Sequence, residues 1–444
     1  MANSTAQSSA QSAPSYTGPF ITLTFLFFAF GFITTLNGTL VPYLRSVFTL
    51  PYGWAMLATS AFFLAYLIFS APSAKLIDAI GYKRTMIVSL FVQVVGVLML
   101  VPAAKMPSFP LFLAAIFVVG AGVTALQNAA NPYVTILGPE HSAPARLTLA
   151  QAANSMGTVV APLIAGAFIL KGATELPATA SVAERVSAAA SVIHPYLFIA
   201  AVLFLLGVIV IGLHLPQVAR ATKSAAEEAA AAKRSIWSCR HTVLATVGIF
   251  VYVGVEVGLS AIAINYFKEQ GVSSATIPSF LNPLCRLFTF RHISDLTPTG
   301  IAAFLLSLYW LGMLLGRLAG SWILTKIPAG KLLAVLGVAG TVLLLISMRT
   351  HGSVAIWTVV LCGLANSIMF PNIFALGVAG LGPLTSKGSG LIMSACVGGA
   401  IIPPIVGKVA DYVGIQHSFI ILIACYLFVA YFGLWGSKPT RVED

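Results

Sequence analysis

The chain consists largely of apolar stretches that are each long enough to cross a lipid bilayer. About 20 consecutive apolar residues span the hydrocarbon core, and twelve such stretches can be counted in the sequence. Only 8% of the 444 residues are charged, against about 25% in a soluble domain. Because backbone polar groups in lipid must bond within their own segment, spans of this kind are helices. The sequence therefore predicts an all-α membrane protein with twelve transmembrane helices at 20–43, 54–77, 85–103, 109–137, 146–170, 194–214, 242–266, 299–323, 332–348, 354–379, 388–409 and 417–436.

A polar stretch divides these spans into two sets of six. Residues 215–241 are rich in Ala, Lys, Arg and Glu and lie between the sixth and seventh spans. Two fused six-helix repeats are a frequent layout of transporters. The triplet LGP also recurs, at 137–139 and 381–383, where the fourth span of each set ends. We therefore expect two pseudo-symmetric six-helix bundles around a cytoplasmic linker, with the boundaries 1–19 (disordered cytoplasmic tail), 20–214, 215–241, 242–436 and 437–444 (cytoplasmic tail).

The distribution of basic residues orients the spans. More lysines and arginines fall in the segments that are cytoplasmic if the N-terminus is inside than in the segments on the other side. We therefore expect a protein of the cytoplasmic (inner) membrane with both termini in the cytoplasm. The formal net charge of +12 then reflects topology, and nucleic acid is not an expected partner. The five cysteines have no CxxC or metal-ligand spacing, so neither a metal nor a cofactor is expected.

Amide side chains interrupt the apolar pattern in the fourth and fifth spans. Gln127 and Asn131 are four residues apart on one helix, and Gln151 and Asn154 are three apart on the next, so each pair shares one helix face. A buried amide without a partner costs roughly 1–3 kcal/mol. These faces must therefore meet each other, a water-filled cavity or a polar ligand. In a membrane protein, such a pattern indicates a substrate path.

The loop between the second and third spans has a recognisable pattern. Residues 74–84, AKLIDAIGYKR, resemble the G-x-L-a-D-r-x-G-r-K loop of the major facilitator superfamily, with Ala74 in place of the first glycine. In that reading Asp78 caps a neighbouring helix end, while Lys83 and Arg84 hold the cytoplasmic side. The simpler reading is a charged turn that obeys the positive-inside rule.

Longer blocks narrow the resemblance. LQNAANPYVTILGPEHSAPARLTLAQAANS at 126–155 is similar to the segment from the fourth to the fifth helix of the fucose/glucose/galactose–proton symporter family. FGFITTLNGTLVPYLR in the first span, LYWLGMLLGRLAGS in the eighth, and the stretch that begins NSIMFPNIFALG in the tenth resemble the same family. The resemblance implies the major facilitator fold and secondary active transport of a hexose or 6-deoxyhexose by alternating access.

The departures from that family pattern concern its carboxylates. The fucose-type members carry Asn-Asp in the first helix and Leu-Glu-Thr-Ala-Ala-Asn-Pro in the fourth. Here these places read Asn37-Gly38 and Leu126-Gln127. Because Gln127 cannot titrate, the pattern favours the glucose/galactose branch over fucose-type proton coupling.

Sugar hydroxyls both donate and accept hydrogen bonds, and amide side chains match them because they do the same. An aromatic face can stack on the apolar side of the ring. For each single amide the alternative is a helix–helix hydrogen bond, which contributes about 0.6 kcal/mol on average in membranes. The candidate sugar contacts are Asn37, Gln127, Asn131, Gln151, Asn154 and Asn366, with Tyr309 or Trp310 as the aromatic group.

Glu256 is the one carboxylate of the 12 acidic residues that lies deep in a predicted span. An ionised carboxylate at that depth costs several kcal/mol. Glu256 is therefore the candidate site for coupling to H⁺ or Na⁺, and the alternative is a fixed hydrogen bond or a partnership with Arg317. Arg317 lies toward the cytoplasmic end of its helix, where it snorkels or pins a gate across the two halves. Arg146, in the loop before the fifth span, joins the gating and structural set.

The function predicted from these features is transport of a glucose- or galactose-like hexose, coupled to H⁺ or Na⁺ or uncoupled. Two alternatives stay open: a carrier of another neutral solute, and a sugar receptor that does not transport. The sequence has no GxxxxGK[ST] phosphate loop and no HExxH motif, so an enzyme is not expected. The expected partners are the sugar and the lipid bilayer, and we expect a monomer. Residues 267–298 include a run, FLNPLCRLFTF, that is typical of an amphipathic segment at a membrane interface.

Overall fold

The computed structural model describes residues 17–48, 52–106, 108–164, 193–212 and 235–439. Within these ranges every regular element is helical. The α-helices are α1 (Thr17–Phe48), α2 (Tyr52–Lys105), α3 (Phe109–Ile136), α4 (Ala143–Ile164), α6 (Ile193–Gly212), α8 (Arg240–Glu269), α9 (Asn282–Thr289), α10 (Pro298–Ile323), α11 (Ala329–Arg349), α12 (Ser353–Asn366), α13 (Met369–Val378), α14 (Thr385–Ser394), α15 (Gly398–Val413) and α16 (Ile415–Tyr431). Short helices at their ends are η1 (Glu140–Ser142), η3 (Ile236–Ser238), η4 (Ser274–Thr276), η5 (Ser279–Leu281), η6 (Ile293–Asp295), η7 (Gly382–Leu384), η8 (Ala395–Val397) and η9 (Phe432–Gly436).

These helices supply the twelve predicted spans. Within the described ranges, nine helical segments are long and apolar enough to cross a membrane. The longest of them, in α2, supplies two spans because the chain turns at Gly81, where φ is 82°. Both arms of α2 then lie along the same stretch of α3: Ala65 on the first arm packs at Gly120, and Gly96 on the second arm packs at Val119. The described parts of α1 and α4 form the remaining two spans, so the predicted all-α architecture of twelve helices is confirmed.

Two spans of the second half are interrupted near their middles. The tenth span consists of α12 and α13, which are separated at Ser367 and Ile368, and the eleventh consists of α14 and α15, which are joined by η8. An interruption frees backbone groups that need other partners inside a membrane. The carbonyl oxygen of Ser367 accepts a hydrogen bond from Nε of Arg317 at 2.9 Å. A side chain therefore satisfies the backbone at the break in the tenth span.

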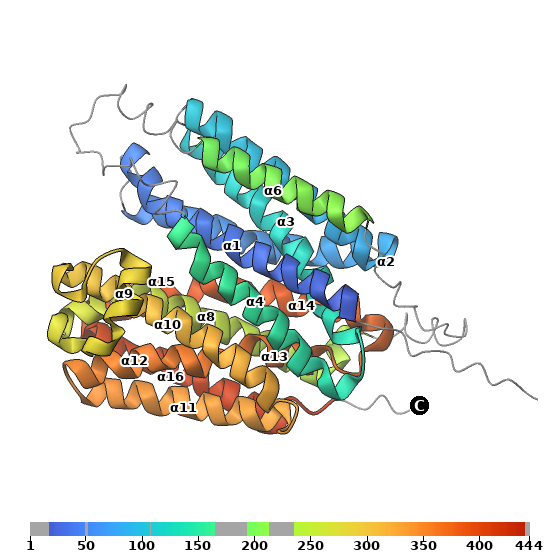
Figure 1. Ribbon diagram of the computed structural model, residues 1–444. Coiled ribbons are helices and arrows are strands. Elements are labelled where there is room, and N and C mark those ends of the chain that lie inside the picture. The colour runs from blue at the N-terminus through green and yellow to red at the C-terminus, as the bar shows by residue number, and fades with distance from the viewer. Residues whose placement is uncertain (1–16, 49–51, 107, 165–192, 213–234, 440–444) are drawn as a thin grey trace, which may run out of the picture.

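The helices form two halves, α1 to α6 and α8 to α16 (Figure 1). Within the first half, α2 packs on α3 and α6, and α1 packs on α4; within the second, α8 packs on α15 and α16, and α12 packs on α10 and α11. The halves meet through two sets of helices: α4 contacts α10 and α13, while α2 and α3 contact α14. This arrangement positions the amide-bearing helices α3 and α4 against the second half.

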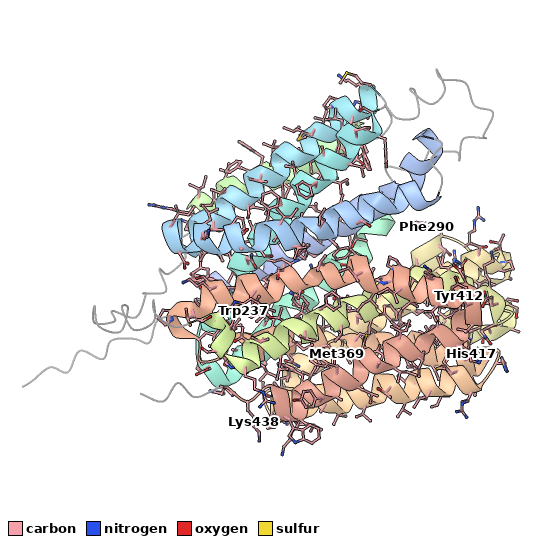
Figure 2. The ribbon with its side chains drawn as sticks, turned by 180° about the vertical axis from the view of Figure 1, so that it is seen from behind. Trp237, Phe290, Met369, Tyr412, His417 and Lys438 are labelled. Carbon is pink, nitrogen blue, oxygen red and sulfur yellow. The ribbon has the colours of Figure 1, made fainter. Side chains whose placement is uncertain are left out.

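The two ends of the bundle are distinguished by their connections. One end, called here the Gly81 end, carries the turn in α2 and the connections α3–α4, α10–α11 and α13–α14; Trp237 and Lys438 lie there (Figure 2). The opposite end, the Gly414 end, carries Phe290, Tyr412 and His417 (Figure 2). Trp237 is 67% exposed and Tyr412 is 79% exposed. Exposed aromatic residues at both ends are typical of the two membrane–water interfaces.

The helix bounds differ from the predicted ones by only a few residues. The first helix begins at Thr17, three residues before the predicted start, and α8 begins at Arg240, inside the predicted 215–241 linker. Most of that linker and most of the 1–19 tail lie outside the described residues, so these domain boundaries stay predictions. In 267–298, α8 continues to Glu269, and the remainder contains the short helix α9 between η5 and η6.

Candidate functional site

Four of the predicted amides lie together on α3 and α4. Gln127 is 8% exposed, and its Nε2 donates to the hydroxyl of Tyr66 at 2.9 Å. It borders a small pocket whose other walls are apolar and include Phe27 and Phe30 of α1. Asn154 is half-buried and donates from Nδ2 to the carbonyl oxygen of Phe27 at 3.3 Å. Gln127 and Asn154 therefore both lie beside the same segment of α1.

The other two amides bond to each other. Nε2 of Gln151 donates to Oδ1 of Asn131 at 3.4 Å, and both residues are buried. Nδ2 of Asn131 reaches across to the second half, where its contact is Sδ of Met393 at 3.6 Å. The distance between Gln151 and Asn131 is long for a hydrogen bond from nitrogen to oxygen, and the sulfur that Asn131 contacts is a weak acceptor. These amides are thus held by weak interactions at the junction of the halves.

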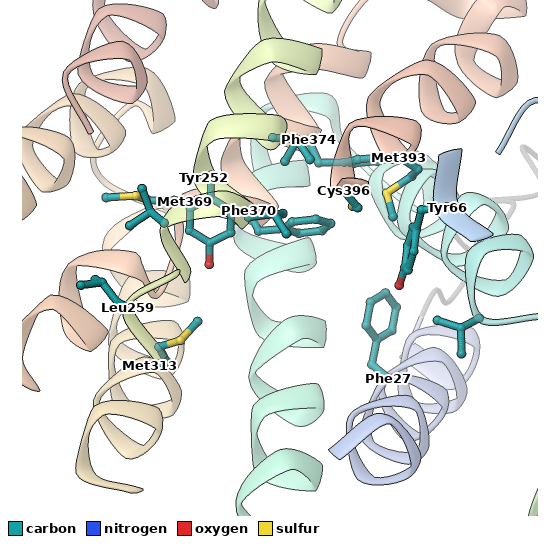
Figure 3. Packing of buried hydrophobic residues seen from close by; sticks show 14 of the residues in the cluster. Phe27, Tyr66, Tyr252, Leu259, Met313, Met369, Phe370, Phe374, Met393 and Cys396 are labelled. Atoms are coloured by element: carbon teal, nitrogen blue, oxygen red, sulfur yellow. The ribbon is translucent and has the colours of Figure 1, made fainter. Parts of the chain in front are cut away.

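The surroundings of this amide cluster (Gln127, Asn131, Gln151 and Asn154) are aromatic and sulfur-containing. Figure 3 shows Phe27 and Tyr66 from the first half, with Met393 and Cys396 from the second half beside Tyr66. Tyr66 also packs against Phe62 and Phe63, with ring centroids 5.8 and 6.2 Å away. The cluster therefore has an apolar, aromatic wall next to polar groups that both donate and accept. That combination suits a small polar solute with an apolar face.

The remaining predicted sugar contacts are placed differently. Only the backbone of Asn37 is described, so its side chain lies outside the described part of the structure. Asn366 is fully buried inside the second half: its Nδ2 donates to the Tyr309 hydroxyl and its Oδ1 accepts from the Tyr426 hydroxyl, both at 2.8 Å. The hydroxyl of Tyr252 donates to the Asn366 carbonyl oxygen at 3.3 Å. We call Asn366 and these three tyrosines the tyrosine hub.

Trp310 is half-buried and adjoins this hub. Its ring lies at 86° to the ring of Tyr309, with centroids 5.3 Å apart. Tyr309 itself is only 2% exposed. In the state described by the structure, Trp310 is therefore the more accessible of the two aromatic candidates.

Glu256 lies on α8 one turn after Tyr252 and is half-buried. Tyr252 is a hydrogen-bonding neighbour of its carboxylate, and Arg317 is the cation that acts on it electrostatically. The carboxylate is therefore connected to the tyrosine hub on one side and to a charged residue of α10 on the other. The structure thus brings Glu256 and Arg317 into one polar region of the second half.

Arg317 connects the two halves. It is 5% exposed and donates to three oxygens: the Ser367 carbonyl of its own half, and the Gln151 carbonyl and Ser155 hydroxyl of the first half. The Gln151 contact measures 3.1 Å. A guanidinium that is buried on neutral acceptors at such a junction forms charge-assisted hydrogen bonds that must break before the halves can separate there.

The other predicted gating and structural residues lie at the Gly81 end. Asp78 accepts a hydrogen bond from the Ser386 hydroxyl of the second half, while Lys83 donates to the Ile211 carbonyl at the end of α6, at 2.8 Å. Arg84 is exposed. Arg146 donates to carbonyl oxygens at the end of α3, including Thr135 at 2.8 Å, and so stabilises that helix end within the first half.

Sequence reasoning missed the partner face on α14. Ser386, Ser389 and Met393 all contact the first half: Ser386 at Asp78, Ser389 at the Asn128 carbonyl (3.1 Å), and Met393 at Asn131. Their spacing of three and four residues is the signal of one helix face. The signal was available in the sequence, but small and sulfur-containing residues do not stand out from an apolar span.

Comparison with known proteins assigns the family. The model of the Major Facilitator Superfamily matches residues 23–403. The chain is 41% identical to the glucose/galactose transporter of Brucella abortus biovar 1 (strain 9-941), over 94% of this chain and 93% of that one. It is 30% identical to the L-fucose-proton symporter of Escherichia coli (strain K12), over 96% and 94% of the two chains. The crystal structure of FucP, a transporter of this superfamily in the outward conformation, superposes with a TM-score of 0.82 over 96% of this chain and all of that one, at 30% identity. The chain is an integral membrane protein that belongs to the Major Facilitator Superfamily, in the group that includes these two relatives.

Proposed function

We propose that this protein is a secondary transporter that moves a glucose- or galactose-like hexose across the cytoplasmic membrane by alternating access. The names of the relatives, a glucose/galactose transporter and an L-fucose-proton symporter, support a sugar as the substrate. The observation that carries the proposal is the weakly held Asn131–Gln151 pair, which lies at the junction of the halves beside an aromatic wall. The relatives are transporters, which agrees with the expectation that the chain is not an enzyme.

The amide cluster supplies the sugar contacts. Each amide offers one acceptor and two donors, and the contacts of 3.3–3.6 Å that Asn131, Gln151 and Asn154 now make are readily exchanged for shorter bonds to hydroxyls. Phe27 and Tyr66 then face the apolar side of the ring. The predicted contacts Asn37, Gln127 and Trp310 complete the set. The other two predicted contacts, Asn366 and Tyr309, are held by the short bonds of the tyrosine hub, so we assign them to the packing of the second half.

The Gly81 end is proposed to face the cytoplasm, with both termini on that side. The contacts of Asp78 with Ser386, and of Arg317 with Gln151 and Ser155, then hold the halves together at the cytoplasmic side. A carrier that is closed there is open or occluded toward the outside. This assignment is supported by the likeness to a structure that is itself in the outward conformation. Release of the sugar inward requires these cross-half bonds to break.

Glu256 is the proposed coupling site. The first half carries Gln127 on the face of its sugar-binding amides, and an amide cannot bind a proton at physiological pH. Glu256 is a carboxylate in a span, and its neighbour Arg317 bonds to the first half at the junction. Binding of H⁺ or Na⁺ there neutralises the charge that faces Arg317, which links the ion to the cross-half contacts. Without coupling, the same architecture is a uniporter.

The test is uptake of radiolabelled glucose, galactose and fucose by proteoliposomes, with and without imposed H⁺ or Na⁺ gradients, for the wild type and Glu256→Gln. If a gradient drives accumulation by the wild type while the variant only equilibrates the sugar, Glu256 is the coupling site. If both proteins equilibrate sugar and neither gradient concentrates it, the protein is a uniporter. The matched control is Glu269→Gln, which makes the same change at the exposed end of the same helix.

Two other functions are distinguished by the same experiment. A carrier of another neutral solute gives no flux of any of the three sugars and no competition by them. A sugar receptor binds sugar without flux. We expect a monomer in the bilayer, and detergent-solubilised protein should scatter light with the mass of one 46.5 kDa chain plus its micelle.

A further inference from the structure

Most of the unpartnered buried polar atoms lie where the two halves meet. Among the described side chains there are five such atoms: Oε1 of Gln93, Oδ1 of Asn128, Oγ1 of Thr148, and both Nδ2 and Oδ1 of Asn372. Thr148 and Asn372 are 0% exposed. Buried polar groups are nearly always bonded, so each exception needs a reason.

Thr148 lies at the contact between α4 and α10. A Cβ placed on Gly320 of α10 would be 3.9 Å from Cγ2 of Thr148. One turn further along α4, Gln151 accepts the hydrogen bond of Arg317. Thr148 is therefore on the same junction face as the Arg317 contact, but nearer to the Gly81 end.

Asn372 approaches the same place from α13. The side chain of Ile368 fills the space over Gly320, since a Cβ there would be 2.3 Å from Cγ2 of Ile368. Asn372 stands one turn after Ile368, so the two share a helix face. The neighbouring Ile373 instead packs toward Gly248 of α8, where a Cβ would be 3.1 Å from Cγ2 of Ile373. Because Ile368 and Thr148 both lie over Gly320, and α13 also contacts α4, we infer that the amide of Asn372 lies on the face that meets the first half.

The other two residues differ in their surroundings. Asn128 uses its Nδ2 on the Ser70 carbonyl at 3.0 Å and lies at the level of the amide cluster. Gln93 packs against Gly122 of α3, inside the first half. Only Thr148 and Asn372 combine a place at the junction, a position nearer to the Gly81 end than Gln151, and unbonded atoms on both partners.

An unbonded buried polar group disfavours the structure that contains it by roughly tenfold. When the halves separate at the Gly81 end, the same atoms face the opened space and can bond there. Between them they offer an amide donor, an amide acceptor and a hydroxyl, which match the donor-and-acceptor character of hydroxyl groups.

We propose that Asn372 and Thr148 form an exit subsite that binds the hydroxyl groups of the departing sugar once the halves have separated at the Gly81 end. This inference rests on the proposed function. In the closed junction the two side chains have no partner, so the subsite exists only in the inward-open state. It lies beyond the amide cluster on the path to the cytoplasm, and water is the other source of hydroxyl groups that would fit it.

The test uses D-galactose with Asn372→Leu and Thr148→Val, which keep the volume and remove the polar atoms. Entry and exit are measured in right-side-out and inside-out membrane vesicles. The half-saturation concentration from the cytoplasmic side should rise about tenfold for each variant, which is the loss of one or two hydrogen bonds to the sugar. The half-saturation concentration from the outer side should change less than about twofold, because that approach uses the amide cluster.

A second measurement follows the junction itself without sugar. Spin labels on Lys75→Cys and Lys387→Cys, which are exposed at the Gly81 end of opposite halves, report the distance between the halves. The five native cysteines are buried, which favours labelling at the introduced sites. Removal of the unbonded groups should favour the closed junction. The ratio of molecules with the short label distance to molecules with the long one should rise about tenfold over that of the wild type.

Gln93→Leu is the matched control, because it removes an unbonded buried amide within one half and should change neither measurement. Thr341→Val is the control for Thr148→Val, since the Thr341 hydroxyl bonds to the Gly337 carbonyl of its own helix.

If wild-type vesicles carry galactose and both variants keep the wild-type half-saturation concentration from the cytoplasmic side, the subsite is overturned. If the label distances change but the half-saturation concentration from the cytoplasmic side does not, Asn372 and Thr148 bind water in the open junction. That result also overturns the subsite. If the wild type carries no galactose at all, it is the proposed function that fails.

Discussion

In the second half, Asn366 holds both ends of its amide in hydrogen bonds of 2.8 Å, to the hydroxyls of Tyr309 and Tyr426. In the first half, Asn131 has a bond of 3.4 Å from Gln151 and a sulfur contact of 3.6 Å. Both asparagines are 0% exposed, and both are amides in membrane spans. Burial alone therefore does not separate a structural amide from a binding one, whereas the quality of its bonds does.

The difference has a physical basis. An amide with short bonds to fixed partners loses those bonds if a ligand takes them, so the ligand gains little net free energy. An amide with long bonds loses little and can form better ones. By this argument Asn131, Gln151 and Asn154 of the amide cluster bind the sugar, while the tyrosine hub holds α8, α10, α12 and α16 together. Four substitutions test that division.

The largest effect is expected for Gln151→Leu. An amide that forms two hydrogen bonds to a sugar contributes about 2–3 kcal/mol, which is about 30- to 150-fold in Kd. The thermal midpoint should change little, because the bonds lost within the protein are long. Isothermal titration with glucose and galactose measures Kd, and a thermal scan measures Tm. Unchanged affinity with a large loss of Tm would assign Gln151 to structure and remove the distinction between the halves.

Asn366→Leu should show the reverse. The hydroxyls of Tyr309 and Tyr426 lose their partner in a buried place, which costs about 1–3 kcal/mol for each group that stays unbonded. Each kcal/mol lowers Tm by roughly 2–4 °C in a domain of this size. The Kd for sugar should stay within about threefold of the wild type. Asn154→Leu is the matched control, since it removes a half-buried amide of the amide cluster and should lower affinity with little change in Tm.

Arg317→Gln tests whether contacts at the junction of the halves act independently of the amide cluster and the tyrosine hub. The substitution removes charge-assisted bonds to Gln151 and Ser155 and should favour separation of the halves at the Gly81 end by about tenfold. Distances between spin labels on opposite halves measure that shift. Arg349→Gln, an exposed change at the Gly414 end, is the control. An unchanged distribution of distances would show that the other cross-half contacts suffice to hold this end closed.

Much of the fold was predictable because lipid leaves few options. Length and apolarity determine a spanning helix. The amide faces were predictable for the same reason: side chains at spacings of three and four share one side of a helix. The structure then brings Asn131 and Gln151 into contact with each other.

The tyrosine hub was not predictable, because its members come from four helices. Tyr252, Tyr309, Asn366 and Tyr426 lie on α8, α10, α12 and α16, and no spacing within one helix connects them. The contact of Arg317 with the Ser367 carbonyl was not predictable for another reason. The Ser367 carbonyl is free only because the helix breaks between α12 and α13, and a break of that kind depends on tertiary packing. The sequence names Tyr309, Asn366 and Arg317 as candidates but does not identify the residues that they contact.

Tyr426→Phe gives the smallest expected effect and the sharpest test of the hub. It removes one hydroxyl and leaves the ring, so Oδ1 of Asn366 loses its donor while the apolar packing of Tyr426 stays. The free energy of unfolding should fall by about 1 kcal/mol, with Kd for sugar unchanged. Tyr412→Phe, at a residue that is 79% exposed, should alter neither quantity. If Tyr426→Phe weakens sugar binding without lowering stability, the hub is part of the binding site, and the second half uses its amide as the first half does.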